Sequence, residues 1–228
     1  MITRTTDTDG VSTIVLDDGK VNALDVGVFR ALDAAFDACA DDAAIVLAGR
    51  AGIFSAGVNL RLVPTLDRAG LTELLVTFAR TTHRIWLEPR PVVAAVTGHA
   101  VAAGTILAMA CDHAIAAEGD YRWGLTETTI GFALPSWVIV LARGNVRADR
   151  LDDLALSGAV VSPGQAVECG FADALAPAGQ VVEFAQRKAR ELAVLPRLAY
   201  AATKRRLRGP ASEAALADLA RDTDEMLA

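Results

Sequence analysis

The sequence is poor in cysteine, in aromatic side chains and in long apolar runs. Its three cysteines, Cys39, Cys111 and Cys169, are odd in number and lack close pairing, which favours reduced core thiols in a cytoplasmic protein over a disulfide framework. Aromatic residues make up only 5%, so small side chains carry much of the 53% hydrophobic fraction and favour close packing of helices on sheets. The weakly apolar stretch 91–111 is interrupted by polar residues and glycine, which argues against a membrane span.

Positive charge and metal-binding patterns are also scarce. The net charge of −6 argues against a nucleic-acid partner. The one compact basic run, 204–208, fits a solvated helix face better than a phosphate contact for a ligand, the alternative reading. The three histidines, His83, His99 and His113, are too scattered for a zinc site, so we expect no metal. We also expect no leader peptide, because the N-terminal residues lack a basic and apolar signal.

Short β-rich runs alternate with helical patterns along most of the chain, which is typical of an α/β fold. Asp112, at a helix-to-strand turn, is expected to have a structural hydrogen-bonding role. Beyond Pro135 the sequence becomes almost wholly helical. The strands are predicted at 11–16, 44–48, 91–97 and 113–117, and the helices at 26–40, 71–87, 102–110, 181–195 and 210–227.

Three glycine-containing loops follow predicted strands, the usual place for ligand binding in α/β folds. In residues 53–60, Gly57 lets the backbone turn and frees the next N–H groups, although an ordinary β–α loop explains the pattern equally well. Residues 97–104 run from a strand into a helix start, whose exposed N–H groups suit developing negative charge. A structural turn is the alternative for this second loop.

The third loop, 124–131, contains one carboxylate, Glu127, in a largely uncharged stretch that leads into Pro135 and Trp137. A glutamate in such a place is more often a helix-start or turn residue than a catalytic one. Apolar surroundings would raise the pKa of Glu127 and make it a better base near neutral pH.

Together these segments resemble the motifs of the crotonase superfamily, also called the enoyl-CoA hydratase/isomerase family, over nearly the whole chain. Residues 21–24 (Val-Asn-Ala-Leu) are similar to the first motif, where the family's chain passes the CoA moiety. Residues 54–60 are similar to the second, with Asn59 in place of the usual aspartate, and residues 98–112 are similar to the third. The ordered set is more specific than any single motif.

The resemblance implies an acyl-CoA thioester as the substrate, with CoA as part of it and no separate cofactor. It also implies an oxyanion hole made by the backbone N–H groups of Val58 and Ala103, where Ala103 replaces a common glycine. Each well-aimed donor stabilises a transition state by roughly 3–4 kcal/mol. The implied contacts to CoA and substrate are Lys20, Val21, Ala23, Ala56, Gly57, Asn59 and Leu60.

The carboxylates distinguish the reactions within the family. Its hydratases use two acids, and the position of the first is Ile106 in this chain, so only the second, Glu127, remains. One base suffices to move a double bond, by taking a proton from C2 and returning it to C4. The surroundings of Glu127 resemble mitochondrial-type Δ3,Δ2-enoyl-CoA isomerases of fatty-acid β-oxidation, which implies Glu127 as the catalytic residue and Ile106 and Trp137 in the acyl pocket.

The same resemblance implies an α/β fold with a crotonase-like ββα superhelix, or spiral, as the core over residues 1–190. Residues 191–228 would form a helical C-terminal region used for trimerisation, in a homotrimer or a dimer of trimers.

Two other functions stay open. An enoyl-CoA hydratase-like enzyme would need a second acid, for which Asp120 and Glu73 are the nearest candidates in the sequence. A non-catalytic acyl-CoA-binding protein would explain the altered motif positions Asn59 and Ala103.

Overall fold

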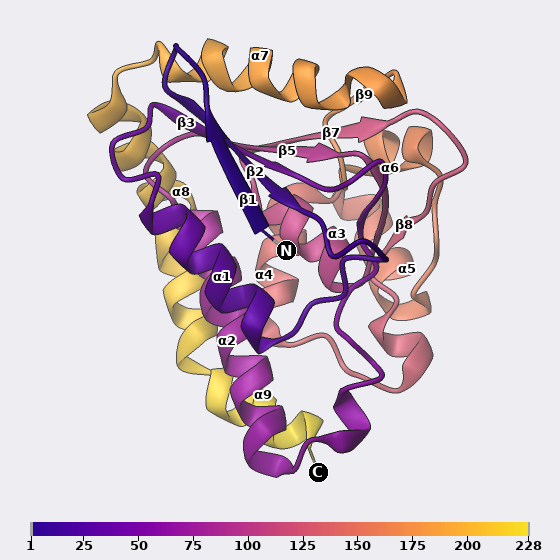
Figure 1. The fold of residues 1–228 in the computed structure, drawn as a ribbon. Helices are drawn as coiled ribbons and strands as arrows, with labels where there is room; N and C mark the ends of the chain where they lie inside the picture. Colours follow the sequence, from indigo (N-terminus) through magenta and orange to yellow (C-terminus); the bar gives the residue numbers. More distant parts are fainter. Residues whose placement is uncertain (1, 228) are drawn as a thin grey trace.

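The computed structural model describes residues 2–227, and its strands form two sheets (Figure 1). The larger has the order β1-β2-β3-β5-β7-β9, with β1 antiparallel to β2 and every other pair parallel. The smaller is a parallel sheet of β4, β6 and β8. The strands are β1 (Ile2–Thr6), β2 (Val11–Leu16), β3 (Ala44–Ala48), β4 (Gly52–Ser55), β5 (Val92–Val96), β6 (Gly98–Val101), β7 (His113–Ala117), β8 (Trp123–Gly124) and β9 (Ala174–Ala176).

Helices follow the strands in a regular order. A long strand, a short strand and a helix recur as β3-β4-α2, β5-β6-α3 and β7-β8-α4, which is the expected ββα repeat. The helices are α1 (Val26–Asp37), α2 (Arg68–Leu87), α3 (Ala103–Ala110), α4 (Ser136–Asn145), α5 (Ala148–Ser157), α6 (Pro163–Cys169), α7 (Val181–Ala193), α8 (Arg197–Ala217) and α9 (Leu219–Met226), with short 3-10 helices η1 (Val63–Thr65), η2 (Glu127–Ile130) and η3 (Ala178–Gln180).

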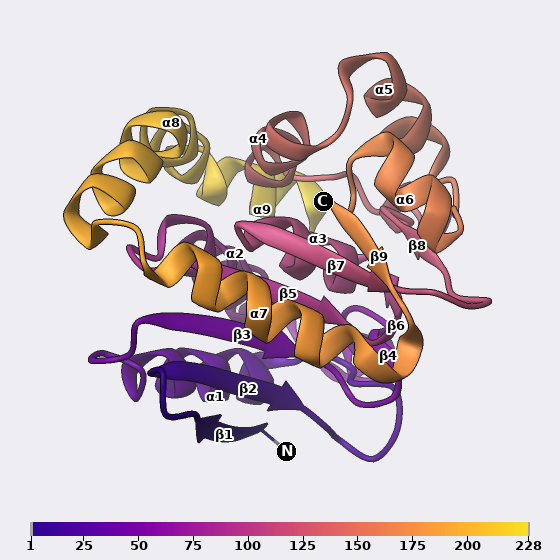
Figure 2. The same cartoon turned by 90° about the horizontal axis from the view of Figure 1, so that it is seen from above.

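Both faces of the large sheet are covered, which explains why β3 and β5 are buried along their whole length (Figure 2). Helix α7 crosses one face, where its Ala185 and Ala189 pack on Val46 and Val93. Alternate strand residues such as Leu47 point to the other face, into the main core with α1, α2, α3 and α4. The small side chains on α7 allow the close packing of helix on sheet that the composition predicts.

The strands β2, β3 and β7 and the helices α2, α3 and α7 confirm the sequence predictions to within a few residues at their ends. Among the residues described, no helix is long and apolar enough to cross a membrane.

Other predictions of elements were only partly right. The described chain after Pro135 is mostly helical as expected, but β9 returns to the edge of the large sheet beside β7. No helix begins at Pro210; this residue lies inside α8. Helix α1 confirms the first predicted helix and ends at Asp37, a few residues before the expected end near residue 40. The strand β1 was missed because its residues are polar and mostly exposed, so they show no apolar alternation.

Candidate active site

A cavity of about 540 Å³ lies between the loops at the ends of the strands and two helices, α2 and α9. Its volume is in the range of small-molecule binding sites. Its walls are mostly apolar: α2 contributes Leu71, Leu74, Leu75 and Phe78. The polar exceptions are Thr126, Glu127, Asp222 and Thr223.

Val58 lines the cavity. The orientation of its backbone is fixed by pairing with Leu24. The two form a parallel bridge in which the Leu24 N–H donates to the Gly57 carbonyl and the Asn59 N–H donates to the Leu24 carbonyl. In such a bridge the N–H of the middle residue points away from the partner strand. The Val58 N–H therefore faces away from Leu24 and has no backbone acceptor among the residues described.

Ala103 is the first residue of α3 and also lines the cavity. The first N–H groups of a helix have no intrahelical acceptor. The preceding residue, Ala102, has φ 51° and ψ −123°, a conformation that L-residues rarely adopt. The Ala102 N–H donates to the Gly124 carbonyl at 2.8 Å, so the strained residue is held between β8 and the helix start. The backbone of Ala103 is thereby fixed beside the cavity.

Gly57 allows the two loops to come together. Its φ is 91°, and a Cβ at this position would lie 3.0 Å from the Ala102 Cβ and 3.4 Å from the Ala103 nitrogen. A larger residue would force the loops apart. The backbones of Val58 and Ala103 are thus brought together at one cavity, and their use as an oxyanion hole stays a prediction.

Glu127 begins η2, three residues after the end of β8. Because β8 pairs with β6 through Val101 and Gly124, the turn after it lies beside the start of α3. The Glu127 Oε2 atom is buried and has no hydrogen-bond partner among the described residues. Burial raises the pKa of Glu127 to about 7. The residue is therefore a cavity carboxylate poised to exchange protons near neutral pH.

The two residues predicted for the acyl pocket also line this cavity. Ile106 is buried on α3, one turn beyond Ala103. Trp137, on α4, is buried and meets the ring of Phe78 edge-on, with ring centroids 5.0 Å apart. No carboxylate stands at or beside Ile106 on α3, so this wall of the cavity is apolar.

The residues predicted for CoA contacts lie on two adjacent loops. The Ala56 N–H donates to the Val21 carbonyl, which joins the first loop to the second. Of the predicted residues, Ala56 and Leu60 line the cavity, whereas Lys20 and Val21 are exposed outside it. Asn59 does not line the cavity; its side chain accepts the Arg61 N–H and stabilises the turn that follows. Their contacts with CoA stay a prediction.

The first of these loops is held in place by the exposed side chain of Asp18 and the buried side chain of Asn22. Burial alone would raise the pKa of Asp18, but N–H groups of Asn22, Lys20 and Ala23 donate to its carboxylate and lower the pKa overall. Asn22, at φ 51°, donates to the Leu16 and Phe54 carbonyls. Ala23 therefore has a fixed place at the edge of a second, smaller cavity, beside Asp18.

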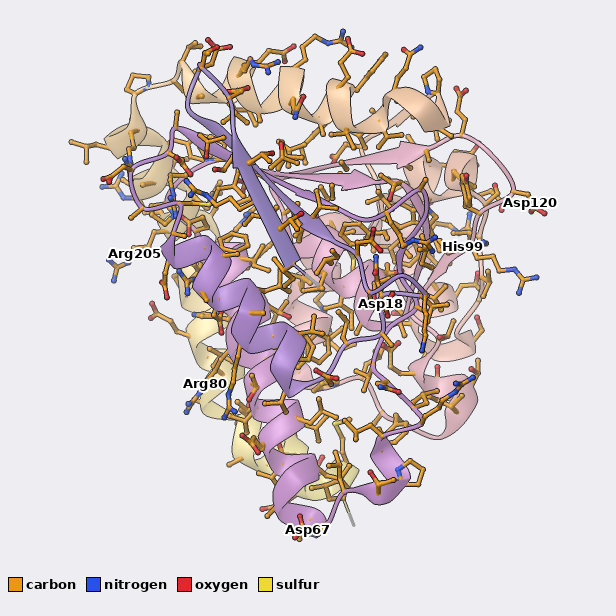
Figure 3. All side chains as sticks on the ribbon, in the orientation of Figure 1. Asp18, Asp67, Arg80, His99, Asp120 and Arg205 are labelled. Carbon is orange, nitrogen blue, oxygen red and sulfur yellow. The ribbon has the colours of Figure 1, made fainter. Side chains whose placement is uncertain are left out.

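The two candidates for a second acid do not line the cavity. Glu73 is exposed and pairs with Arg30 at 2.6 Å. Asp120 lies at the outer edge of the molecule, on the loop between β7 and β8 (Figure 3). The sequence reading missed Asp222, a carboxylate on α9 that does line the cavity. The sequence did contain one signal for it. A helical spacing joins Leu219, Asp222, Thr223 and Met226, and it places Asp222 on a largely apolar helix face.

The basic run is not a solvated face as a whole. Lys204 is buried, and its ammonium donates to the Glu88 and Arg90 carbonyls and to Asp112 at 2.6 Å. Burial lowers the pKa of Lys204, and Asp112 acts in the opposite direction. Arg208 binds the other oxygen of Asp112 at 2.7 Å. Arg205, in contrast, is exposed and points outward at the molecular edge (Figure 3). The structural role expected for Asp112 is confirmed.

Comparison with known proteins gives the family. The family model described as enoyl-CoA hydratase/isomerase matches residues 6–227. The chain therefore belongs to the enoyl-CoA hydratase/isomerase, or crotonase, family. The solved structure of an enoyl-CoA hydratase from Mycobacterium ulcerans is 30% identical, with a TM-score of 0.94 over 100% of this chain and 99% of that one. The expected crotonase-like α/β fold is confirmed.

The relatives include both reaction types. A putative enoyl-CoA hydratase of Thermus thermophilus is 39% identical over 66% of this chain, and the match spans 60% of that protein. A Mycobacterium tuberculosis protein that one structure describes as an enoyl-CoA isomerase and another as a probable enoyl-CoA hydratase is 31% identical, and the first structure has a TM-score of 0.92 over 98% of both chains. Human mitochondrial Δ3,Δ2-enoyl-CoA isomerase shares the fold at 22% identity, with a TM-score of 0.94 over 99% of this chain and 90% of that one. Family membership thus does not single out the mitochondrial isomerases.

Proposed function

We propose that this protein is a Δ3,Δ2-enoyl-CoA isomerase that acts in fatty-acid β-oxidation in the cytoplasm. The observation that carries the proposal is the cavity carboxylate Glu127, whose pKa is raised. The first acid of the family's hydratases has no counterpart here, because the apolar Ile106 stands at its position. Moving a double bond requires one base, whereas hydration requires a carboxylate for water and a second acid.

The proposed mechanism uses Glu127 twice. As a carboxylate it takes a proton from C2 of the 3-enoyl thioester, and the negative charge moves to the thioester oxygen as a dienolate. The N–H groups of Val58 and Ala103 donate to this oxygen, and each stabilises the developing charge by roughly 3–4 kcal/mol. Protonated Glu127 then returns the proton to C4, which gives the 2-enoyl thioester and restores the carboxylate.

The surroundings of Glu127 support this cycle. Its unpartnered Oε2 needs no bond to be broken before it accepts a proton. A pKa of about 7 means that the carboxyl group gains and loses a proton with a similar driving force at neutral pH. The cavity walls are largely apolar, and side chains such as Ile106, Leu74 and Phe78 offer no hydrogen bond that would hold a competing water.

Replacing Glu127 with glutamine tests the proposal. Glu127→Gln keeps the size of the side chain but removes the base, so we expect isomerisation of a 3-enoyl-CoA to fall by roughly 10²–10⁴-fold. Binding of an acyl-CoA, measured by calorimetry, should change little. Full isomerase activity in the variant would refute the assignment of Glu127, and acyl-CoA binding with no turnover by the wild type would instead support a non-catalytic binding protein.

Enoyl-CoA hydration is the second candidate, and the observation that favours it is Asp222, a second carboxylate at the cavity. Both Asp222 oxygens, however, already accept hydrogen bonds from Ser136, through its N–H and its hydroxyl group. Assaying 2-enoyl-CoA hydration and 3-enoyl-CoA isomerisation on one preparation separates the two functions. Hydration faster than isomerisation would overturn our proposal.

We further propose that the protein is a homotrimer or a dimer of trimers, with residues 191–228 in the contacts. Supporting this, the apolar side chains of Val194, Leu198 and Leu207 are 82%, 87% and 77% exposed in the single chain. Such exposure of large side chains favours an interaction surface. Sedimentation equilibrium gives the mass directly, and a monomer at all concentrations would refute this part of the proposal.

A further inference from the structure

Helix α9 forms one wall of the cavity that contains Glu127. Its contributions, Leu219, Asp222, Thr223 and Met226, lie on one helical stripe, and Leu227 continues it. The helix packs against α2, α4 and α8, and in Figure 1 it lies near the lower end of the molecule, below α3. The cavity thus has one wall that comes from the C-terminal part of the chain.

Asp222 is the residue that fixes this wall. Its side chain is 8% exposed, and its Oδ2 accepts the Ser136 N–H at 2.6 Å while its Oδ1 accepts from the Ser136 hydroxyl group at 3.1 Å. Ser136 is the first residue of α4, so its N–H has no intrahelical acceptor and lies at the positive end of the helix dipole. The next two residues, Trp137 and Val138, line the cavity. The carboxylate therefore links two walls of the same cavity.

A second and more exposed link joins α9 to α2. Arg68, the first residue of α2, pairs with Asp224 at 2.8 Å and donates to the Leu227 carbonyl at 3.2 Å. The side chains of Arg68 and Asp224 are 60% and 73% exposed, so water screens this pair and it contributes little. The buried bonds of Asp222 are the stronger ones, because charge-assisted hydrogen bonds strengthen away from water.

We propose that Asp222 is a positioning residue that holds α9 closed over the cavity and thereby limits the length of the acyl group. This inference rests on the proposed acyl-CoA function. A short acyl group fits while the Asp222–Ser136 bonds stay intact. A longer one has to displace α9, and its affinity is lowered by the free energy of breaking those bonds. Removing the carboxylate removes that penalty for long acyl groups only.

Binding of saturated acyl-CoA thioesters tests this without any turnover. Calorimetry would compare butyryl-, octanoyl- and palmitoyl-CoA, the last below its micellar concentration, with the wild type, Asp222→Ala and Glu225→Ala. In Asp222→Ala we expect the affinity for palmitoyl-CoA relative to butyryl-CoA to rise roughly tenfold, the effect of losing one charge-assisted hydrogen bond. Glu225 is on the same helix but 72% exposed and outside the cavity lining, so its variant should keep the wild-type ratio.

Two more variants keep the test decisive if Asp222→Ala does not fold. Asp222→Asn retains an acceptor for the Ser136 N–H and should give a smaller rise in the ratio, and Arg68→Ala, at the surface, should give a small rise of the same sign. An unchanged ratio in all three, or an equal loss of affinity for every chain length, would overturn the inference. If the wild type binds acyl-CoA but does not isomerise 3-enoyl-CoA, the isomerase proposal fails while this inference stands; no binding of any acyl-CoA refutes both.

Discussion

Glu127 combines three properties that rarely occur together in a structural residue. It lines a cavity, one of its oxygens is buried without a hydrogen bond, and burial raises its pKa to about 7. Buried polar atoms are nearly always paired, and unpaired ones cluster where a ligand or a reaction requires them. The sequence could identify this residue only through its motif, because the cavity that it lines is built from elements as distant in the chain as α2 and α9.

The raised pKa of Glu127 predicts the pH dependence of the proposed isomerisation. The base must be deprotonated in the free enzyme, so kcat/KM for a 3-enoyl-CoA should rise with pH and level off above about pH 7. Initial rates across the neutral range measure this profile. A profile that is flat from mildly acidic to mildly basic pH would contradict the role of Glu127 as the base.

The same pKa also predicts how stability varies with pH. The folded state binds the Glu127 proton more tightly than the unfolded chain, so stability should fall as pH rises from 4.5 to about 7, by at most about 3 kcal/mol. Glu127→Gln cannot ionise and should lose this dependence, being stabilised relative to the wild type above neutral pH. Urea unfolding of both proteins at mildly acidic and mildly basic pH measures the difference. Parallel pH dependences would show that the carboxylate is not buried in the folded state.

Ile106 and Asp222 show the limits of reading single residues. Ile106 was informative because a carboxylate was expected at its motif position, and the structure puts its side chain in the cavity wall. Asp222 lies in no motif, and its burial depends on a contact with Ser136, 86 residues earlier in the chain. No local sequence pattern predicts a contact between residues so far apart in the chain.

At the scale of elements, the apolar strands β3 and β7 were predictable because their burial on both faces leaves an unbroken apolar run. The short strands β4 and β6 were read as loops, since each has only four residues and begins with a glycine. Their pairing with one another, rather than their own composition, makes them strands. This small sheet brings the two loops of the site together.

The strained start of α3 gives a prediction for this element. Ala102 adopts a conformation that favours glycine, so Ala102→Gly should raise the free energy of unfolding by about 1 kcal/mol. Ala103→Gly, one residue on and helical, should lower it by about 0.5–1 kcal/mol. Chemical denaturation of the two variants measures both changes. A loss of stability in both would mean that the Ala102 backbone is not strained.

At the scale of the whole molecule, α8 is fastened to the core by internal charges. Lys204 and Arg208 both bind Asp112, whose Oδ2 also accepts the Val92 N–H at the start of β5. The sequence reading treated the basic run as mostly solvated, because Asp112 lies 92 residues from Lys204 and cannot be paired with it from local spacing. The run instead joins the C-terminal helices to the large sheet.

Removing the buried cation tests this connection. Lys204→Met leaves Asp112 with one cation fewer and should lower the free energy of unfolding by about 3 kcal/mol, since breaking a buried pair is costly. Arg205→Met, on the same helix but exposed, should change it by less than about 0.5 kcal/mol. Guanidinium denaturation compares the two. Equal effects would mean that Lys204 is no better paired than its solvated neighbour.

Helix α9 and the loops of Val58, Ala103 and Glu127 line one cavity but belong to different parts of the chain. The proposed control of acyl length and the proposed proton transfer therefore rest on different elements. Under the role proposed for Asp222, substitutions in this helix change the space available to a ligand without altering Val58, Ala103 or Glu127 themselves. Substrate range can then be retuned on one helix, which lies more than 90 positions from Glu127 in the sequence.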